Sequence, residues 1–109
     1  MKIASFPFQI LNWAVVTKEE RKGETGTATW QIQMVNDIRV RIVEYSPGYK
    51  ADHWCNKGHI IYCVEGEMDT ELKDGRIMRL QKGMCYFVGD NNEAHRSSTL
   101  LGCKLFIVD

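Results

Sequence analysis

The sequence predicts an all-β fold, a closed or nearly closed barrel or jelly roll in a single domain. Three observations lead to this prediction. Apolar and polar residues alternate with a period of two, turn residues separate the alternating runs, and no segment has convincing helical spacing apart from a short turn near Pro7–Val16. Eight short strands in roughly eighty residues favour closure, because a closed barrel leaves no unpaired edge.

The expected strands follow one another from residue 27 onward. They are Thr27–Met34, Asp37–Tyr45, His59–Val64, Glu67–Lys73, Arg76–Leu80, Met84–Val88, His95–Thr99 and Cys103–Val108. In the second of these, Ile38, Val40 and Ile42 alternate with Arg39 and Arg41. This is the pattern of a half-buried strand, and we expect the two arginines to face water rather than to bind a carboxylate inside the barrel.

Turn chemistry separates the expected strands, as a series of short strands requires. The turn dipeptides are Pro47-Gly48, Glu65-Gly66, Asp74-Gly75, Lys82-Gly83 and Gly89-Asp90. The strongest hairpin signal is Lys73-Asp74-Gly75, because an Asp-Gly pair between two alternating runs suits a tight turn.

We expect the chain to form one domain, residues 1–109, because no linker rich in Pro, Gly or Ser divides it. Residues 27–109 make the barrel, and residues 1–26 form an N-terminal arm and a loop. The loop is the polar, charged stretch Lys18–Gly26.

The composition excludes several classes of partner. Fourteen Lys and Arg residues balance fourteen Asp and Glu residues, so the chain lacks the excess positive charge that nucleic acids and anionic membranes attract. No apolar run reaches transmembrane length, and the N-terminal stretch is a poor signal peptide. With no export signal and no C-x-x-C pair, the four cysteines are expected to be reduced thiols in a cytoplasmic protein.

Potential metal ligands gather in one short segment. His53, Cys55 and His59 lie within seven residues, and His95 follows a glycine-bounded strand that a barrel could return to the same mouth. Imidazole and thiolate are natural ligands for zinc and its neighbours in the transition series. A hydrogen-bonded core histidine is the ordinary alternative, but no other group in the chain has this density.

Two stretches resemble the paired motifs of the cupins. Pro47-Gly48 through Glu65-Gly66-Glu67 resembles the first motif, G-x5-H-x-H-x3–4-E-x6-G, and Gly83 to His95 resembles the second, G-x5-P-x-G-x2-H-x3-N. The alignment puts His53 at the first histidine, Cys55 at the second, His59 at the glutamate and His95 at the histidine of the second motif.

The resemblance is closer still to one group of small cupins, because Asp52-His53-Trp54-Cys55 is similar to the Asp-His-Cys-Trp motif for which that group is named. The resemblance covers roughly residues 38 to 108 and implies a cupin-type jelly roll, also called a double-stranded β-helix barrel. The family's proline and second glycine are missing from the second motif, where Gly89, Asn91 and Asn92 would make the turn.

A divalent transition metal, namely zinc, nickel or iron, is the expected cofactor, because nitrogen and sulfur ligands outnumber oxygen. Three histidines and the Cys55 thiolate would close a tetrahedral site, which suits structural zinc. If Cys55 turned away, the three histidines would leave positions open for water or substrate, as a catalytic metal needs.

Other residues take supporting roles in this prediction. Asp52 is expected to orient a ligand, and Trp54, Tyr62 and Tyr86 are candidates for the walls of a small-molecule pocket. An aromatic residue packed at the barrel rim is an equally good interpretation of Trp54. The remaining cysteines are expected to be small buried hydrophobes: Cys63, Cys85 and Cys103.

Three functions remain open at this point. The first is a metalloenzyme acting on a small organic molecule, perhaps as an oxygenase or isomerase, which the resemblance implies. The second is a sensor of a metal or small molecule without turnover. The third is a structural zinc site in a protein whose function lies elsewhere. Fold analogy alone does not choose among them.

The apolar residues of the N-terminal arm predict that the protein is a homodimer. Phe6, Phe8, Ile10, Leu11 and Trp13 have few places to be buried in so small a core, and the polar stretch after them would let the arm reach a partner. The cupin resemblance implies the same, because many small cupins pair through sheet edges and exchanged N-terminal strands. The alternative is an arm that folds back over its own barrel.

Overall fold

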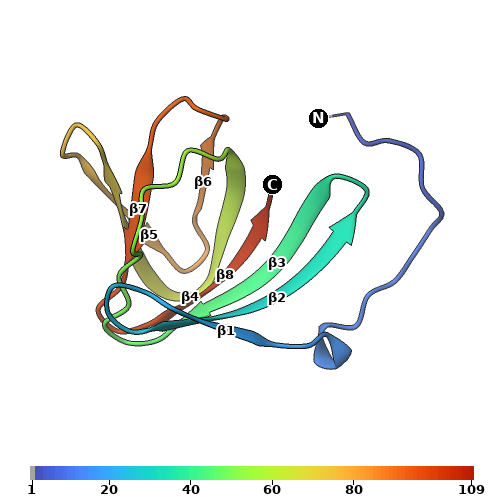
Figure 1. Cartoon of the computed structure of the whole chain (residues 1–109), viewed down its shortest axis with the longest axis horizontal. Coiled ribbons are helices and arrows are strands. Elements are labelled where there is room, and N and C mark those ends of the chain that lie inside the picture. The colour runs from blue at the N-terminus through green and yellow to red at the C-terminus, as the bar shows by residue number, and fades with distance from the viewer. Residues whose placement is uncertain (1) are drawn as a thin grey trace.

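The computed structural model describes residues 2–109, in which eight strands and one three-residue 3-10 turn form an all-β jelly roll (Figure 1). The elements are η1 (Trp13–Val15), β1 (Glu19–Lys22), β2 (Thr27–Val35), β3 (Ile38–Tyr45), β4 (His59–Leu72), β5 (Ile77–Gln81), β6 (Cys85–Val88), β7 (His95–Ser98) and β8 (Cys103–Val108). The predicted fold class is confirmed. No helix in the described residues is long and apolar enough to cross a membrane.

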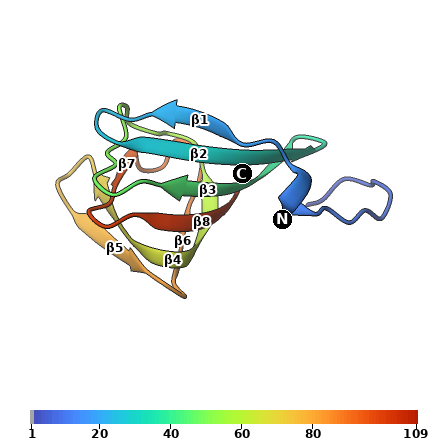
Figure 2. The same cartoon turned by 90° about the horizontal axis from the view of Figure 1, so that it is seen from below.

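Two antiparallel sheets share the long strand β4. The first has the order β1-β2-β3-β8-β4, and β6 pairs with the first part of β4. The second consists of β5 and β7, which pair with the last part of β4. Figures 1 and 2 show β4 passing from one sheet to the other, so that the two sheets enclose the space between them.

Strand β4 changes sheets at an irregularity near its middle. Its pairing with β8 shifts register between Cys63 and Glu65, and Gly66 follows with a φ of 76°. A Cβ on Gly66 would lie 2.3 Å from the carbonyl oxygen of Gly102. The glycine is therefore required twice, by its left-handed backbone and by the close approach of a neighbouring chain segment.

The sequence-based boundaries differ from the structure in two places. The two strands expected over His59–Val64 and Glu67–Lys73 are one strand, because Glu65-Gly66 makes a bulge instead of a turn. The stretch Lys18–Gly26, expected to be a loop, contains β1, which pairs with the edge of β2. All four β1 residues are exposed, so the strand has no hydrophobic alternation to recognise.

The core fills the space between the inner faces of the two sheets. Its buried members are Val43, Ile61, Cys63, Met68, Leu80, Cys103, Leu105 and Ile107. Burial of Cys63 and Cys103 confirms the prediction for these thiols, and all four cysteines are free. The prediction for Cys85 is wrong: it lies opposite Tyr62 on the outer face and is exposed.

The strand faces of β3 are the reverse of those expected. Its register pairs Arg41 with Ile107 and Val43 with Leu105, both of which are core residues, so the arginines share the inner face. Ile38, Val40 and Ile42 lie on the outer face. Because the outer face is also apolar, alternation alone did not identify which side is buried.

We predict that Gly66→Ala lowers the free energy of unfolding by well over the ~1–2 kcal/mol that a left-handed backbone costs an alanine. The added methyl group would collide with the Gly102 carbonyl. Urea denaturation measures the loss. Gly75→Ala is the matched control, because Gly75 has a φ of 95° but no atom within 4 Å of its added Cβ. Equal losses in the two variants would contradict the packing argument.

Candidate metal centre

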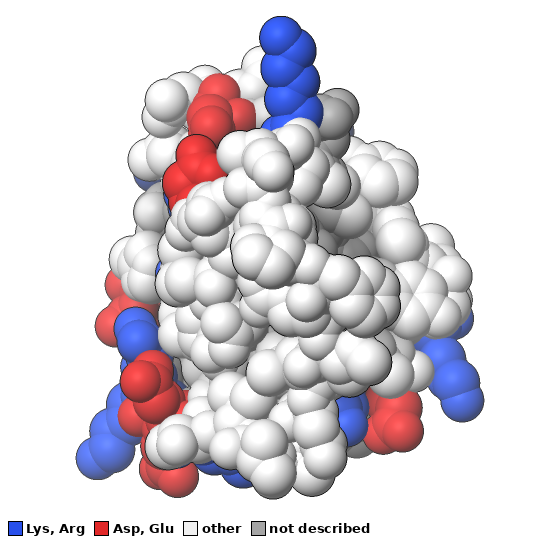
Figure 3. Space-filling model, turned by 90° about the vertical axis from the view of Figure 1, so that its right-hand side faces the viewer, with Lys and Arg blue, Asp and Glu red and all other residues white. Residues whose placement is uncertain are grey.

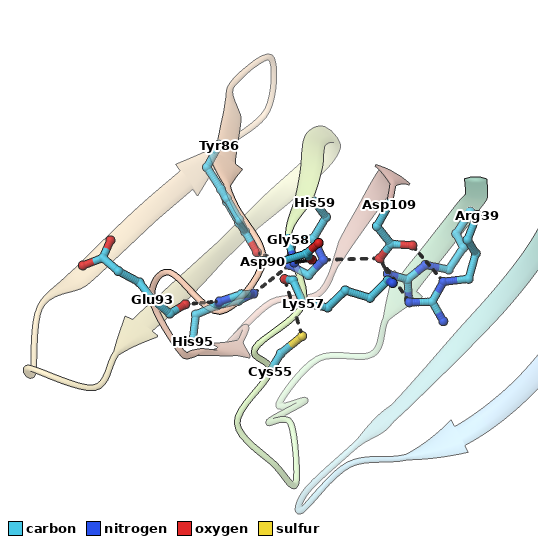
Figure 4. A network of polar contacts seen from close by, with 11 residues as sticks. Arg39, Cys55, Lys57, Gly58, His59, Tyr86, Asp90, Glu93, His95 and Asp109 are labelled. Carbon is cyan, nitrogen blue, oxygen red and sulfur yellow. Dashed lines mark hydrogen bonds and ion pairs between the residues drawn. The ribbon is translucent and has the colours of Figure 1, made fainter. Parts of the chain in front are cut away.

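Two buried histidines face each other across the barrel. His59 begins β4 and His95 begins β7, and their Nε2 atoms lie 2.7 Å apart with the rings at 83° (Figure 4). The turn at Gly89–Asn92 places β7 so that His95 returns to the start of β4, where Gly58 donates its backbone N–H to Asp90. This is the return of His95 that the sequence predicted.

The opposite nitrogen of each ring is already committed. His59 Nδ1 lies 3.3 Å from Asp109 Oδ2, and His95 Nδ1 lies 2.8 Å from the backbone carbonyl oxygen of Glu93. Carboxylate and carbonyl oxygens only accept hydrogen bonds, so both Nδ1 atoms donate. In the neutral rings the two Nε2 lone pairs then point at each other, an arrangement that is repulsive unless a cation lies there, either a proton or a metal ion.

Cys55 completes a group of three donors. Its backbone exchanges two hydrogen bonds with His95, of 2.8 and 3.0 Å, which fixes the preceding segment against β7. The donor atoms of Cys55, His59 and His95 all lie within 4.8 Å of one another. A hydrogen bond with His95 is the main cause that lowers the pKa of the Cys55 thiol, and the same contact raises the pKa of His95. Two imidazoles and a thiolate-prone sulfur fit zinc, nickel or iron.

The fourth predicted ligand, His53, is not part of this group. Its side chain is 75% exposed, and its Nδ1 lies 2.6 Å from the Asp52 carboxylate. Asp52 thus contacts a predicted ligand, the position expected of an orienting residue, but it touches none of the three clustered donors. His53 does line the same cavity as the cluster.

The aromatic candidates separate into three positions. Tyr86 lines the cavity, with its hydroxyl 3.5 Å from His59 Nε2. Tyr62 lies on the outer face of β4 and is exposed. Trp54 does not line this cavity, and it packs against the charged ends of Lys73 and Arg96, each 4.4 Å from its ring centroid.

The sequence analysis missed Asp109 as a site residue, and its expectation for Arg41 was wrong. Asp109 accepts two hydrogen bonds from Arg39, one from Arg41 and the contact from His59, and its side chain is fully buried. The Arg41 side chain is only 6% exposed. One sequence signal was that Val43 and Tyr45 continue the arginine face of β3, whereas Glu44 interrupts the other face.

This ionic group holds the Asp109 carboxyl in its charged form. Burial alone would raise the Asp109 pKa, but hydrogen bonds from His59 and Arg39 and the charges of both arginines hold it well below its usual range. Burial is also the main cause that lowers the pKa of Arg41, which Asp109 counters. Figure 4 shows the carboxylate between Arg39 and His59, on the side of the His59 ring away from His95.

The three donors open into a cavity of about 280 Å³ inside the barrel. Its lining includes Arg39 and Arg41 as well as the three donors, and Asp109 Oδ2 joins Arg41 to His59. Aromatic side chains cover much of the remainder: Trp30, Tyr45, Tyr49 and Tyr86. A volume near the lower end of the range for ligand pockets suits a small organic molecule.

No family model matches the sequence. One curated relative is the L-ectoine synthase of Oceanobacillus iheyensis, which is 29% identical over 82 residues, covering 71% of this chain and 63% of that enzyme. The chain therefore spans less than two thirds of the length of this relative.

Solved structures share the fold at low sequence identity. A predicted oxalate decarboxylase from Thermotoga maritima superposes with a TM-score of 0.77 at 16% identity, covering 92% of this chain and 96% of that chain. A cupin-2 domain containing protein from Shewanella frigidimarina superposes with a TM-score of 0.61 at 19% identity, covering 73% of this chain and 78% of that chain. Fe(II)-HppE with an alternative substrate superposes with a TM-score of 0.75 at 12% identity, covering 94% of this chain and 60% of that chain. The fold is the cupin-type jelly roll that the motifs implied.

We predict that Asp109→Asn lowers the free energy of unfolding by about 3–5 kcal/mol, because Arg41 would keep a buried charge without its carboxylate. Asp69→Asn is the matched control. It breaks the pair with exposed Arg79 and should cost about 1 kcal/mol or less. Chemical denaturation measures the free energy of unfolding of both variants. If Asp109→Asn loses no more of it than Asp69→Asn, the buried ion pairs do not contribute to stability.

Proposed function

We propose that this chain binds a divalent transition metal through Cys55, His59 and His95 and presents it to a small organic molecule in the barrel cavity. The observation that carries the proposal is the 2.7 Å approach of two Nε2 atoms whose rings donate from Nδ1 to other partners. A metal ion relieves this lone-pair repulsion and takes the nearby Cys55 sulfur as a further ligand.

The donor number favours an accessible site over a closed one. A structural zinc site uses four protein ligands, whereas three ligands leave a position for water or substrate. Asp109 and the Glu93 carbonyl hold the two imidazoles in the tautomer that offers Nε2, the role that outer hydrogen-bond partners play at metal sites. A bound ion would supply Lewis-acid polarisation of a substrate oxygen or an activated water.

The relatives favour an enzyme. The names of three similar proteins describe an ectoine synthase, a predicted oxalate decarboxylase and an Fe(II) protein with an alternative substrate. The proposed activity, that of an oxygenase or isomerase acting on a small molecule, is compatible with these relatives. Placement in the Asp-His-Cys-Trp group of cupins rests on residues 52–55, and a cytoplasmic location rests on the expected reduced thiols.

His53 supports one competing function. It lines the cavity beside the cluster and is held only by the exposed Asp52. Rotation of His53 toward the ion would give the four-ligand set of the sequence analysis and a closed structural zinc site. A sensor without turnover would instead keep the open position and bind its ligand there.

The metal proposal predicts about one zinc, nickel or iron ion per chain after purification without added metal, measured by elemental analysis. Cys55→Ser should weaken metal affinity by more than about 100-fold, because a hydroxyl replaces a thiolate ligand. Titration against a chromogenic chelator measures the affinity. Cys85→Ser is the control, since its thiol is exposed and outside the cavity. No bound metal in the wild type, or equal affinity in both variants, contradicts the assignment of Cys55.

We also propose that the protein is a homodimer that pairs through the outer face of the first sheet. Val40, Val108, Ile60 and Phe87 lie side by side there, in successive strand pairs. Phe87 is 74% exposed. The face in Figure 3 carries little charge, in contrast to its margins. An uncharged apolar sheet face of this kind is typical of an interface between copies.

The N-terminal arm extends this apolar surface. Phe6, Leu11 and Trp13 line a groove against the outer face of the first sheet, whereas Phe8 is 93% exposed and Ile10 is also exposed. Figure 2 shows the arm projecting beyond the strands. The arm thus covers part of its own sheet, as the alternative required, and offers its remaining apolar residues to a second copy.

Light scattering tests the dimer. We predict that the full chain is dimeric at micromolar concentration, and that Phe87→Ser or Phe8→Ser weakens the dimer because each removes exposed apolar surface. Ile77→Ser, at an exposed position on β5, should leave the dimer intact. A monomeric full-length chain would defeat the proposal.

A further inference from the structure

The barrel interior carries more positive than negative charge. Arg39 and Arg41 point inward from β3, and the Asp109 carboxylate serves them both. Asp109 also contacts His59: its Oδ2 atom meets Arg39, Arg41 and His59, whereas its Oδ1 atom accepts only from Arg39. Two guanidinium charges therefore share one side-chain carboxylate in this group. Arg39 is partly open to solvent, whereas Arg41 is buried and lines the cavity.

Two buried donors beside this charge have no partner. The Nε atom of Arg41 and the Nε1 atom of Trp30 are both inaccessible to solvent and make no hydrogen bond. Both residues line the cavity that holds the Cys55–His59–His95 cluster. An unsatisfied buried N–H costs about 1–3 kcal/mol, and a small movement of the side chains that cover these two atoms would let an acceptor in the cavity relieve that cost.

The Trp30 ring restrains the guanidinium group of Arg41. The guanidinium of Arg41 lies 4.6 Å from the centroid of the Trp30 ring, and that of Arg21 lies 4.2 Å from it. Stacking on an indole restrains a guanidinium that would otherwise move freely. The cavity therefore combines a fixed positive group, unused N–H donors and apolar ring surface.

We propose that the ligand of this cavity is a small organic carboxylate, whose oxygens accept hydrogen bonds from Arg41 and Trp30 while its other end faces the metal cluster. One excess charge matches one carboxylate, and a planar pair of oxygens matches the guanidinium fork. A phosphate group carries about two charges, one more than the Arg39–Arg41–Asp109 group leaves unmatched. The orientation toward the metal rests on the proposed function, but binding of the carboxylate to Arg41 does not.

Isothermal titration calorimetry of the zinc-loaded full-length protein tests the inference. The probes are acetate, pyruvate, malonate and benzoate, each compared with its neutral amide, and inorganic phosphate. We expect at least one carboxylate to bind at least about tenfold more tightly than its amide and more tightly than phosphate, as a charge-assisted hydrogen bond would give. Equal affinity for every acid and amide pair, or preference for phosphate, overturns the proposal.

Two substitutions locate the binding group. Arg41→Met should remove the preference for carboxylate over amide, and Arg41→Lys should keep only part of it because the ammonium lacks the planar fork. Arg79→Met is the control, since Arg79 is exposed and pairs with Asp69 outside the cavity. Circular dichroism verifies that each variant folds. If the Arg41→Met protein does not fold, the Arg41→Lys result decides, and an unchanged preference in it overturns the proposal.

The metal content of every sample separates this inference from the proposed function. A wild-type protein that takes up no metal but still prefers carboxylates through Arg41 would contradict the metal site and support the anion site. A protein that binds one metal per chain, but whose carboxylate preference survives Arg41→Met, would contradict only the anion site.

Discussion

The Asp109 carboxylate is the contact on which the interior of this barrel depends. It follows β8, accepts hydrogen bonds from two arginines of β3 and contacts the first residue of β4. Three neighbouring strands are thus joined by one buried charge. A buried ionic group of this kind seldom improves stability over an apolar core of the same volume. Its presence inside a barrel of 109 residues therefore indicates a function for the site.

The same contact prepares His59 for chemistry. Because Asp109 accepts a hydrogen bond from the Nδ1–H of His59, that ring offers Nε2 to the centre of the barrel, and the Glu93 carbonyl does the same for His95. The bend of β4 at Gly66 lets one strand pair with β6 near His59 and with β7 beyond the bend. The second sheet can then fold back and place His95 against His59. The geometry of the candidate site is thus a consequence of strand curvature as much as of ligand choice.

The arrangement also gives the cavity two kinds of polar group. Its lining includes the soft donors of the candidate metal site and the Arg41 guanidinium, which stacks on Trp30. With the proposed metal bound, a ligand would meet an electrophilic centre and a fixed positive charge. Such a combination orients a small asymmetric molecule without a large contact area, which is how pockets with few polar groups achieve specificity.

The sequence by itself determined the fold class and most of the candidate donors. Period-two alternation and glycine turns are local properties, so they identified the strands of a jelly roll, and the density of His and Cys marked residues 53–59 and His95. The face of β3 could not be identified in this way, because Ile38, Val40 and Ile42 look as buried as any core residues, yet they lie outside.

Only the tertiary structure decided which donors meet and what surrounds them. It brought Cys55, His59 and His95 together, left His53 on the exposed side with Asp52, and added Asp109, which is 50 residues from His59 in the sequence. Residue spacing describes one strand at a time, whereas a site inside a barrel is made where several strands converge. The register and curvature of the sheets, set by packing and by the bulge in β4, determine that convergence.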